Sequence, residues 1–415
     1  MIKKGDIFSK CYDDKSGFFS NVKALLSQYQ QLPELSGSIG AHMLCNGKEV
    51  INWSSNDYLG LTNHPSNRAI ERQVINEGPA NLPMGSRFLT NNSAFKEFEA
   101  KFASFIHCQS SMVFSTGYLA AIGVIPALSG PGDIILIDAE AHSCLFDAVK
   151  LAISNGALYK VFRHNDMESL EAFLKLAREK AEAGIMIICD GVYSMKGDLA
   201  KLKEIITLKE KYGARLFLDD SHGGGVMGLH GRGTAHHFNV ANEVDLVLHT
   251  FSKAFGAVGG CISGNKEIID YLRRSAKTYI FSHSMQLIFM KKILNSLELI
   301  LANSDFLRSL WRNTELLQFG LQNAGFNIGD TQSPITPVTM QVIEQKTSMR
   351  YLFHFVSILR EEHQIYVSAV TYPAVPSNKA LIRLIPTAGH SIQDIEKTIK
   401  AFVEVRHKLG SYPLS

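Results

Sequence analysis

The sequence has no apolar run of membrane-spanning length, no CxxC pair and no concentrated stripe of positive charge. A membrane helix needs about 18 consecutive apolar residues, so we expect no transmembrane segment. The polar first residues also lack the apolar stretch of a signal peptide. The six cysteines are widely spaced and predict reduced thiols in a cytoplasmic protein. A formal net charge of +3 is too small to indicate a nucleic-acid partner.

What the sequence does contain is the composition of an ordinary globular protein, with 46% hydrophobic and 20% charged residues in a chain of 415. This length predicts more than one hydrophobic core. We expect an N-terminal arm over residues 1–60, a large domain over residues 61–300 and a smaller C-terminal α+β domain over residues 301–415.

Short apolar runs alternate with helical segments in the expected large domain. Such alternation predicts an α/β fold in which a mainly parallel sheet lies between helices. In the expected small domain, the pattern predicts a helix, then two short strands and then a last helix. The predicted strands are residues 111–114, 133–137, 185–189, 215–218, 246–249, 335–342 and 380–385, and the last helix is residues 392–407.

Polar residues follow three of the predicted strands, where ligands bind in an open α/β sheet. A helix opens at Gly117 and offers backbone N–H groups to a phosphate, although such turns are also ordinary helix caps. Asp219 and Asp220 follow another strand, at a place where ionised groups need partners. Lys253 follows the strand that ends at His249 and precedes a glycine-rich stretch. Desolvation there would lower the pKa of the lysine and make its amine nucleophilic.

Together these residues match the needs of one cofactor, pyridoxal phosphate (PLP). The cofactor requires a lysine for a Schiff base, an acidic partner that keeps the pyridine nitrogen protonated, and donors for its phosphate. Lys253 and Asp219 supply the first two from successive strand ends. The sequence therefore predicts a PLP enzyme in which Lys253 carries the cofactor.

Two alternatives remain open at this stage. One is a metal-dependent hydrolase, because a single segment contains several residues of plausible ligand type: Asp219, Asp220, His222, His230, His236 and His237. No HExxH-like helical pair accompanies them, and a metal leaves Lys253 without a role. The other is an inactive partner subunit that serves assembly. The joint presence of Lys253, Asp219 and His142 counts against it.

The chain resembles the α-oxoamine synthases, a family of fold type I PLP enzymes. The resemblance runs from about Trp53 to His390 and is carried by motifs in a fixed order. The motifs are residues 54–60, 114–118, 138–142, 190–195, 219–222, 250–253 and 278–282. The resemblance implies a C-acyltransferase that condenses alanine, glycine or serine with an acyl-CoA or acyl-carrier thioester. The products would be an α-aminoketone, carbon dioxide and a free thiol.

The resemblance also implies roles for residues around the cofactor ring. His142 would stack on the pyridine ring, and Asp219 would pair with its nitrogen. His222 and Ser194 would face the ring oxygen. Lys253 would hold the cofactor and then remove the α-proton of the amino acid.

Further residues are implied at the phosphate and at the amino-acid substrate. A homodimer with shared active sites is implied, because phosphate contacts would come from Gly117, Tyr118 and Thr250 of one subunit and from Ser282 and His283 of its neighbour. Arg383 matches the arginine that binds the amino-acid carboxylate, since a guanidinium binds a carboxylate bidentately. Asn56 matches a polar helper.

The sequence departs from the family pattern in two places. Residues 90–93, Thr-Asn-Asn-Ser, stand where members usually have a glycine-threonine turn and a histidine shortly after, which leaves acyl-group recognition open. Ser143 and Cys144 stand where Ala-Ser is usual and change the surroundings of the stacking histidine.

The motifs do not all resemble one subgroup of the family. Residues 54–61 and 219–222 resemble the synthases that join alanine to a pimeloyl thioester, or the glycine acetyltransferases. Residues 114–118 and 192–195 are more similar to serine palmitoyltransferases. On balance the sequence favours the first group, the 8-amino-7-oxononanoate synthases.

Overall fold

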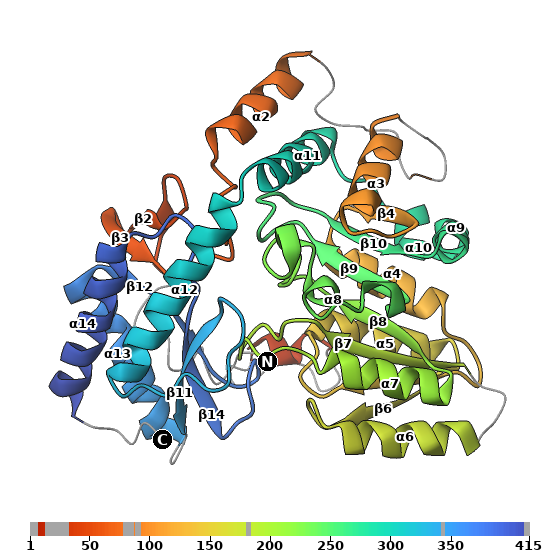
Figure 1. Cartoon of the computed structure of the whole chain (residues 1–415). Coiled ribbons are helices and arrows are strands. Elements are labelled where there is room, and N and C mark those ends of the chain that lie inside the picture. Colours follow the sequence, from red (N-terminus) through yellow and green to blue (C-terminus); the bar gives the residue numbers. More distant parts are fainter. Residues whose placement is uncertain are drawn as a thin grey trace. The chain divides into compact units, whose positions relative to one another are not determined.

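The computed structural model describes residues 7–12, 33–77, 87, 93–179, 184–341 and 345–410. The chain forms two compact units, residues 56–311 and residues 1–55 together with 312–415 (Figure 1). The arm and the two domains predicted with boundaries near residues 60 and 300 stay predictions. Among the helices of the described residues, none combines the length and apolarity needed to cross a membrane.

The unit of residues 56–311 is built on a seven-stranded sheet of order β4-β10-β9-β8-β7-β5-β6. Within this sheet β10 is antiparallel to both of its neighbours, and the remaining pairs are parallel. The strands are β4 (Ser110–Phe114), β5 (Ile134–Asp138), β6 (Leu158–Phe162), β7 (Ile185–Asp190), β8 (Arg215–Asp219), β9 (Leu246–Thr250) and β10 (Gly260–Gly264). This is the mainly parallel α/β sheet that the sequence predicts.

Helices surround the sheet of this unit. They are α2 (Pro65–Glu77), α3 (Ser93–Phe105), α4 (Gly117–Ala127), α5 (Ser143–Ser154), α6 (Met167–Glu179), α7 (Leu202–Tyr212), α8 (Thr234–His237), α9 (Lys266–Ser275), α10 (Lys277–Ile280) and α11 (Leu287–Ala302). Short 3-10 helices add η2 (Leu229–Gly231) and η3 (Ala241–Glu243), and η1 (Ser9–Tyr12) precedes the unit.

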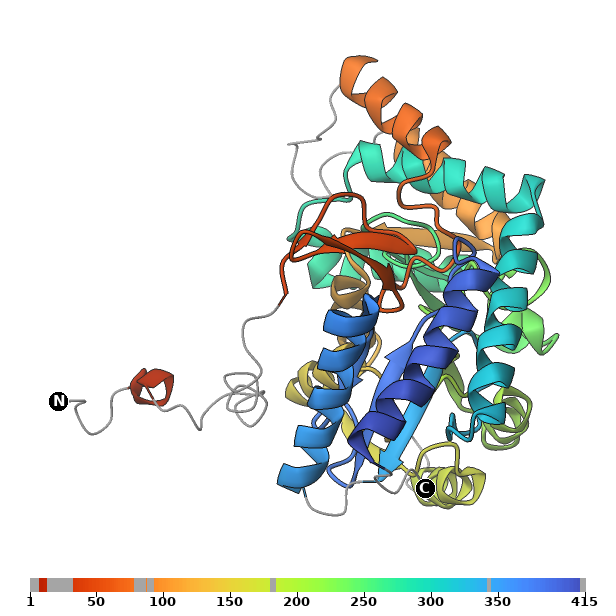
Figure 2. The ribbon, with the colours of Figure 1, turned by 90° about the vertical axis from the view of Figure 1, so that its left-hand side faces the viewer.

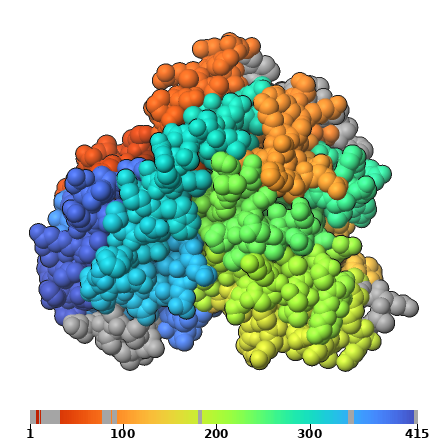
Figure 3. All heavy atoms as spheres, in the orientation of Figure 1, coloured from red at the N-terminus to blue at the C-terminus, as the bar shows by residue number. Residues whose placement is uncertain are grey.

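The strand β5 shows why helices cover both faces of the sheet. All five of its residues are buried. Ile135 and Ile137 belong to a core with residues of α4, α5 and α9, whereas Ile134 and Leu136 belong to a core with residues of α6 and α7. Successive side chains of a strand point to opposite faces, so an unbroken apolar run needs two covering layers. Figure 3 shows yellow-green atoms, the colours of α6 and α7 in Figure 1, on the surface of this unit.

The described residues of the second unit form two small sheets and three α-helices. A four-stranded sheet has the order β1 (Leu35–Ser36), β2 (His42–Cys45), β3 (Lys48–Asn52) and β12 (Ile365–Tyr366). A three-stranded antiparallel sheet has the order β11 (Thr336–Gln341), β14 (Lys379–Leu384) and β13 (Ser368–Val370). The helices are α12 (Asp305–Asn323), which enters the unit at Arg312, α13 (Gln345–His363) and α14 (Ile392–Leu409). Figure 2 shows α13 and α14 side by side.

Candidate active site

One pocket in the unit of residues 56–311 is lined by residues at the ends of five strands, β4, β5, β7, β8 and β9. Because these strands run in the same direction, their carboxyl ends meet at one edge of the sheet. The residues that line the pocket are Gly117, Tyr118, His142, Cys144, Asp190, Val192, Ser194, Asp219, Ser221, His222, Leu248, Thr250 and Lys253. Eight of the site residues predicted from the sequence thus lie together. They are Gly117, Tyr118, His142, Ser194, Asp219, His222, Thr250 and Lys253.

Lys253 lies three residues beyond β9, and its Nζ donates a hydrogen bond to Oγ1 of Thr250 at 2.9 Å. A Cβ at Gly117 would lie 2.1 Å from Cγ2 of Thr250, so only glycine fits where α4 approaches β9. Gly117 begins α4, and the N-cap Thr116 accepts a hydrogen bond from the N–H of Leu119 at 3.1 Å. The N-terminus of an eleven-residue helix therefore lies beside Lys253. Helix N-termini favour phosphate groups.

His142 is the N-cap residue of α5, and its main-chain N–H donates to Oδ1 of Asp190 at 3.2 Å. Its Nδ1 accepts a hydrogen bond from the main-chain N–H of Cys144 at 3.3 Å and lies 3.0 Å from Sγ of Cys144. Burial lowers the pKa of His142; the carboxylate of Asp219 opposes this shift, and Lys253 adds to it.

Asp190 and Asp219 are paired across β7 and β8, and both are buried. Oδ1 of Asp219 accepts a hydrogen bond from the main-chain N–H of Ser221 at 3.0 Å. Burial raises the pKa of Asp190 well above its ordinary value, and the charge of Asp219 acts in the same direction. Two adjacent buried carboxylates resist a double negative charge, so the protonated form of Asp190 is favoured.

His222 has a partner that the sequence did not identify. The hydroxyl of Tyr58 lies 2.8 Å from its Nδ1, and the two rings meet edge to face with their centroids 6.1 Å apart. Tyr58 belongs to the motif of residues 54–60. Its place in that motif could have identified it as a site residue from the sequence. Asn56 is the single site residue that the motif itself predicts.

Residues of the alternative metal site have other partners. Asp220 accepts hydrogen bonds from the N–H and the hydroxyl of Thr234, and burial raises its pKa to about 6. Nε2 of His236 lies 3.0 Å from the carbonyl oxygen of Ile106. Across the described ranges, no group of three or more His, Cys, Asp or Glu side chains is arranged to hold a metal ion. The geometry favours the PLP interpretation over the hydrolase.

Four predicted site residues are not among those that line the pocket. Asn56 is the first residue of the unit of residues 56–311, and Ser282 and His283 lie between α10 and α11. Arg383 is a buried residue of β14 in the other unit, opposite Pro337 of β11. The atypical residues 90–92 lie outside the described residues.

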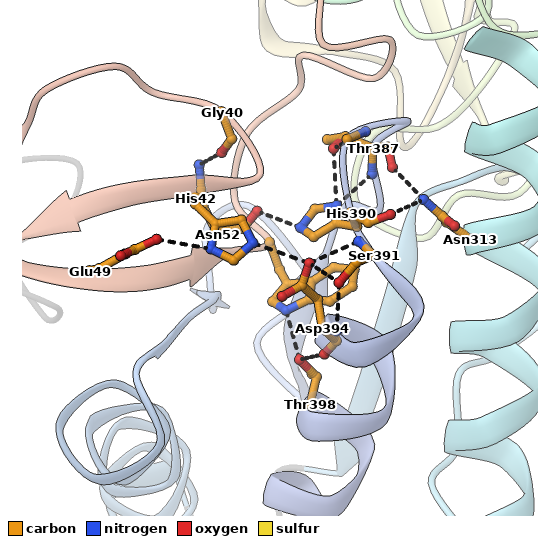
Figure 4. A network of polar contacts seen from close by, with 12 residues as sticks. Gly40, His42, Glu49, Asn52, Asn313, Thr387, His390, Ser391, Asp394 and Thr398 are labelled. Carbon is orange, nitrogen blue, oxygen red and sulfur yellow. Dashed lines mark hydrogen bonds and ion pairs between the residues drawn. The ribbon is translucent and has the colours of Figure 1, made fainter. Parts of the chain in front are cut away.

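A buried polar network holds the turn that follows β14 (Figure 4). The ring of His390 stacks on that of Trp53 with their centroids 3.9 Å apart. Nδ1 of His390 accepts a hydrogen bond from the N–H of Thr387 at 3.0 Å, and Nε2 lies 3.2 Å from the carbonyl oxygen of Asn52. Nδ2 of Asn313 donates to the carbonyl oxygens of Thr387 and His390. The network thus fixes the end of β14, the strand that contains Arg383.

The pocket has the donor set that PLP requires. Lys253 offers an amine, Asp219 a buried carboxylate, and Gly117 a helix start with no side chain to obstruct a phosphate. The buried hydroxyl of Ser221 has no hydrogen-bond partner in the part of the chain that the structure describes. A buried polar atom of this kind is usually satisfied by a ligand or water. The residues present therefore fit the cofactor.

The sequence matches a family model and is similar to named enzymes. The family model for aminotransferase class I and II matches residues 48–402. Cysteate-C-fatty acyltransferase from Capnocytophaga ochracea is 38% identical over 97% of this chain and 95% of its own length. An 8-amino-7-oxononanoate synthase from Thermoanaerobacter pseudethanolicus is 36% identical over 92% of this chain and 94% of its own.

Solved structures of serine palmitoyltransferases are also similar. The Sphingomonas wittichii enzyme is 30% identical, with a TM-score of 0.89 over 99% of this chain and 100% of that chain. The S. paucimobilis enzyme with a bound PLP–myriocin aldimine is 26% identical, also with a TM-score of 0.89, over 98% of this chain and 99% of that chain. The comparisons confirm the predicted family, the fold type I architecture, the acyltransferase class and the cofactor.

Proposed function

We propose that this chain, which belongs to the aminotransferase class I and II family and within it to the PLP-dependent α-oxoamine synthases, transfers a fatty-acyl group from a thioester to cysteate. The observation that supports these substrates is the 38% identity to the Capnocytophaga ochracea enzyme over 97% of the chain. The amino acid loses its carboxyl group as carbon dioxide, its α-carbon bonds to the acyl carbon, and the thiol leaves. The condensation itself is the reaction of the family.

The residues of the pocket divide the work as follows. Bound PLP supplies the electron sink that lets an amino acid lose its α-proton and attack a thioester carbonyl. Nζ of Lys253 would hold the cofactor and would then move the α-proton of the amino acid. Asp219 would keep a proton on the ring nitrogen, because a buried carboxylate stabilises a positive charge beside it. His142 would cover the ring, and His222 and Ser194 would bind its oxygen.

The start of α4 would bind the phosphate. Gly117 and Tyr118 would contact it from that helix, and Thr250 lines the same pocket at the end of β9. Ser282 and His283 of a partner subunit complete its shell, so the active form is a homodimer. Light scattering and mixed dimers test this arrangement: a Lys253→Ala subunit and a Ser282→Ala, His283→Ala subunit should together restore one complete site.

Arg383 binds the substrate carboxylate, with Asn56 as a polar helper. A guanidinium suits a substrate carboxylate, because it can donate two parallel hydrogen bonds to it. We place the enzyme in the cytoplasm. This location is supported by the free cysteines of the described residues, of which Cys45, Cys144, Cys189 and Cys261 are buried.

A substrate panel tests the proposal. The purified PLP-loaded protein is offered cysteate, serine, alanine and glycine, each with acyl-CoA thioesters from acetyl to palmitoyl and with pimeloyl-CoA. Released thiol and carbon dioxide are measured, and the best acyl group is tested again on a carrier protein. Highest kcat/KM for cysteate with a long-chain thioester is the expected result.

Alanine with pimeloyl thioester is the second candidate. It is favoured by the sequence motifs and by the 36% identity to the Thermoanaerobacter pseudethanolicus enzyme. Highest kcat/KM for this pair would replace the first proposal. Serine as the best amino acid with a long-chain thioester would instead make the chain similar in activity to its serine palmitoyltransferase relatives.

A further inference from the structure

The contact between His142 and Cys144 fixes which ring nitrogen of the histidine carries a proton. A main-chain N–H is always a donor, so the hydrogen bond from the N–H of Cys144 at 3.3 Å requires Nδ1 of His142 to be the acceptor. Sγ of Cys144 lies 3.0 Å from the same nitrogen, so its S–H can only donate to it. Two donors from residue 144 thus converge on one lone pair.

The surroundings favour the same state. His142 caps the N-terminus of the twelve-residue helix α5, where the helix dipole disfavours a positive charge. The charged groups that act on the ring are Asp219, Lys253 and Asp147. Burial raises the pKa of the Cys144 thiol, and Asp219 and Asp190 add to this shift, so the thiol keeps the proton that it donates.

We infer that Cys144 is a positioning residue that holds His142 as a neutral imidazole with its proton on Nε2. His142 then meets a molecule in the pocket as a hydrogen-bond donor. A substrate carboxylate or carbonyl oxygen is the matching acceptor. The inference rests on the proposed role of His142 beside the cofactor.

The experiment uses the PLP-loaded protein with ¹⁵N-labelled histidine. Two-bond ¹H–¹⁵N spectra distinguish the two neutral tautomers, and a His142→Gln variant identifies the His142 signal among the 15 histidines. We expect the pattern of an Nε2–H ring at pH 7.5. A ring with Nδ1 protonated would overturn the inference.

The role of the thiol is tested by matched variants. Cys144→Ala removes the thiol but keeps the main-chain N–H of residue 144. The ¹⁵N resonance of Nδ1 should therefore shift to the value of a nitrogen that accepts one hydrogen bond instead of two. The substitution should also move the acid limb of the kcat profile to higher pH, with roughly a two- to five-fold change in the proton-binding equilibrium, as expected for one neutral hydrogen bond. Cys144→Ser, which keeps a donor, should restore both. Cys108→Ala removes a cysteine that does not line this pocket and should change neither.

The results also separate this inference from the proposed substrates. An unchanged Nδ1 resonance in Cys144→Ala would reject the role of the thiol, whatever the protein condenses. An Nε2–H ring in a protein that prefers another amino acid or thioester would reject the proposed substrates and keep the positioning role.

Discussion

The hydroxyl of Tyr58 lies 2.8 Å from Nδ1 of His222, although 164 residues separate them. Both side chains are buried, with exposed fractions of 1% and 8%. A buried histidine that is bonded through Nδ1 has its ring plane fixed, so its second nitrogen points in one direction. Tyr58, a residue of the motif 54–60, thereby orients His222, the residue proposed to bind the ring oxygen.

Replacing Tyr58 with phenylalanine should therefore leave the fold intact and weaken the site. A neutral hydrogen bond contributes about 1 kcal/mol, so we expect roughly a five-fold loss in PLP affinity or in kcat. PLP titration followed by absorbance, and steady-state kinetics, measure the two effects. Tyr271→Phe is the matched control, because the exposed Tyr271 donates a hydrogen bond to the main-chain carbonyl oxygen of Ala127. Equal behaviour of the two variants would contradict the positioning role of Tyr58.

Lys253→Ala should abolish turnover and change the visible absorbance of the loaded protein. The variant loses the amine that is proposed to hold the cofactor, whereas the proposed phosphate contacts of the α4 N-terminus and Thr250 remain. Absorbance spectra and mass measurement of trapped cofactor give readouts that do not depend on activity. Lys266→Ala, an exposed lysine of the same unit, controls for loss of charge. Normal turnover of Lys253→Ala would end the proposed mechanism.

Asp219→Asn should bind PLP and fail in the step that removes the α-proton. A neutral amide no longer stabilises a proton on the ring nitrogen, so the electron sink weakens. Exchange of the substrate α-hydrogen with solvent deuterium, followed by NMR, measures this step without a thioester. The role would be assigned wrongly if Asp219→Asn exchanged the α-hydrogen at the wild-type rate.

The large sheet was predictable because its central strands are unbroken apolar runs. The runs 185–189, 215–218 and 246–249 correspond to β7, β8 and β9, which end one residue later. The strand β10 was missed because its sequence, Gly-Cys-Ile-Ser-Gly, has little β-branched or aromatic character. Its glycine has a packing cause: a Cβ at Gly260 would lie 2.5 Å from Cα of Gly117. The edge strand β6 was missed because it is mostly exposed.

Part of the site was predictable, because residues that follow parallel strands meet at the carboxyl edge of the sheet. Lys253, Asp219 and His142 could be named from the motifs, and the structure brings them into one pocket. Contacts within the pocket could not be named, because pairs such as Tyr58 and His222 depend on how distant loops fold. Cys144 was noted as unusual, but its contact with Nδ1 of His142 follows only from the helix cap.

Stability should depend on pH through His164. Its Nδ1 lies 2.9 Å from Asp138 and its Nε2 lies 2.7 Å from Asp198. Burial opposes protonation, but the two carboxylates outweigh it and raise the pKa of His164 to about 9. Because the ordinary pKa is about 6.5, this stabilisation is full below that pH and is lost as the pH rises through 9.

His164→Gln should therefore lower the urea midpoint most near pH 6 and least near pH 10. His237→Gln, a substitution of an exposed histidine in the same unit, is the control at each pH. A deficit that is constant over this range would mean that the charge of His164 does not contribute.

Arg383→Ala tests the proposed carboxylate-binding role of Arg383. Arg383 is buried in β14, whose end is fixed by the network around His390. If Arg383 binds the substrate carboxylate, the variant should stay folded and bind PLP, but it should need much more amino acid. A hydrogen bond to a charged group contributes about 1.5–3 kcal/mol, so KM for the amino acid should rise roughly ten- to a hundred-fold.

The same variant separates substrate binding from a structural ion pair. KM for the thioester should stay within about two-fold of wild type, because the thioester does not carry the carboxylate that Arg383 binds. Arg383→Lys should recover only part of the amino-acid affinity, since an ammonium lacks the bidentate geometry of a guanidinium. A structural arginine would give the opposite pattern. Thermal stability would then fall in Arg383→Ala while amino-acid KM stayed near normal, and the carboxylate would need another partner.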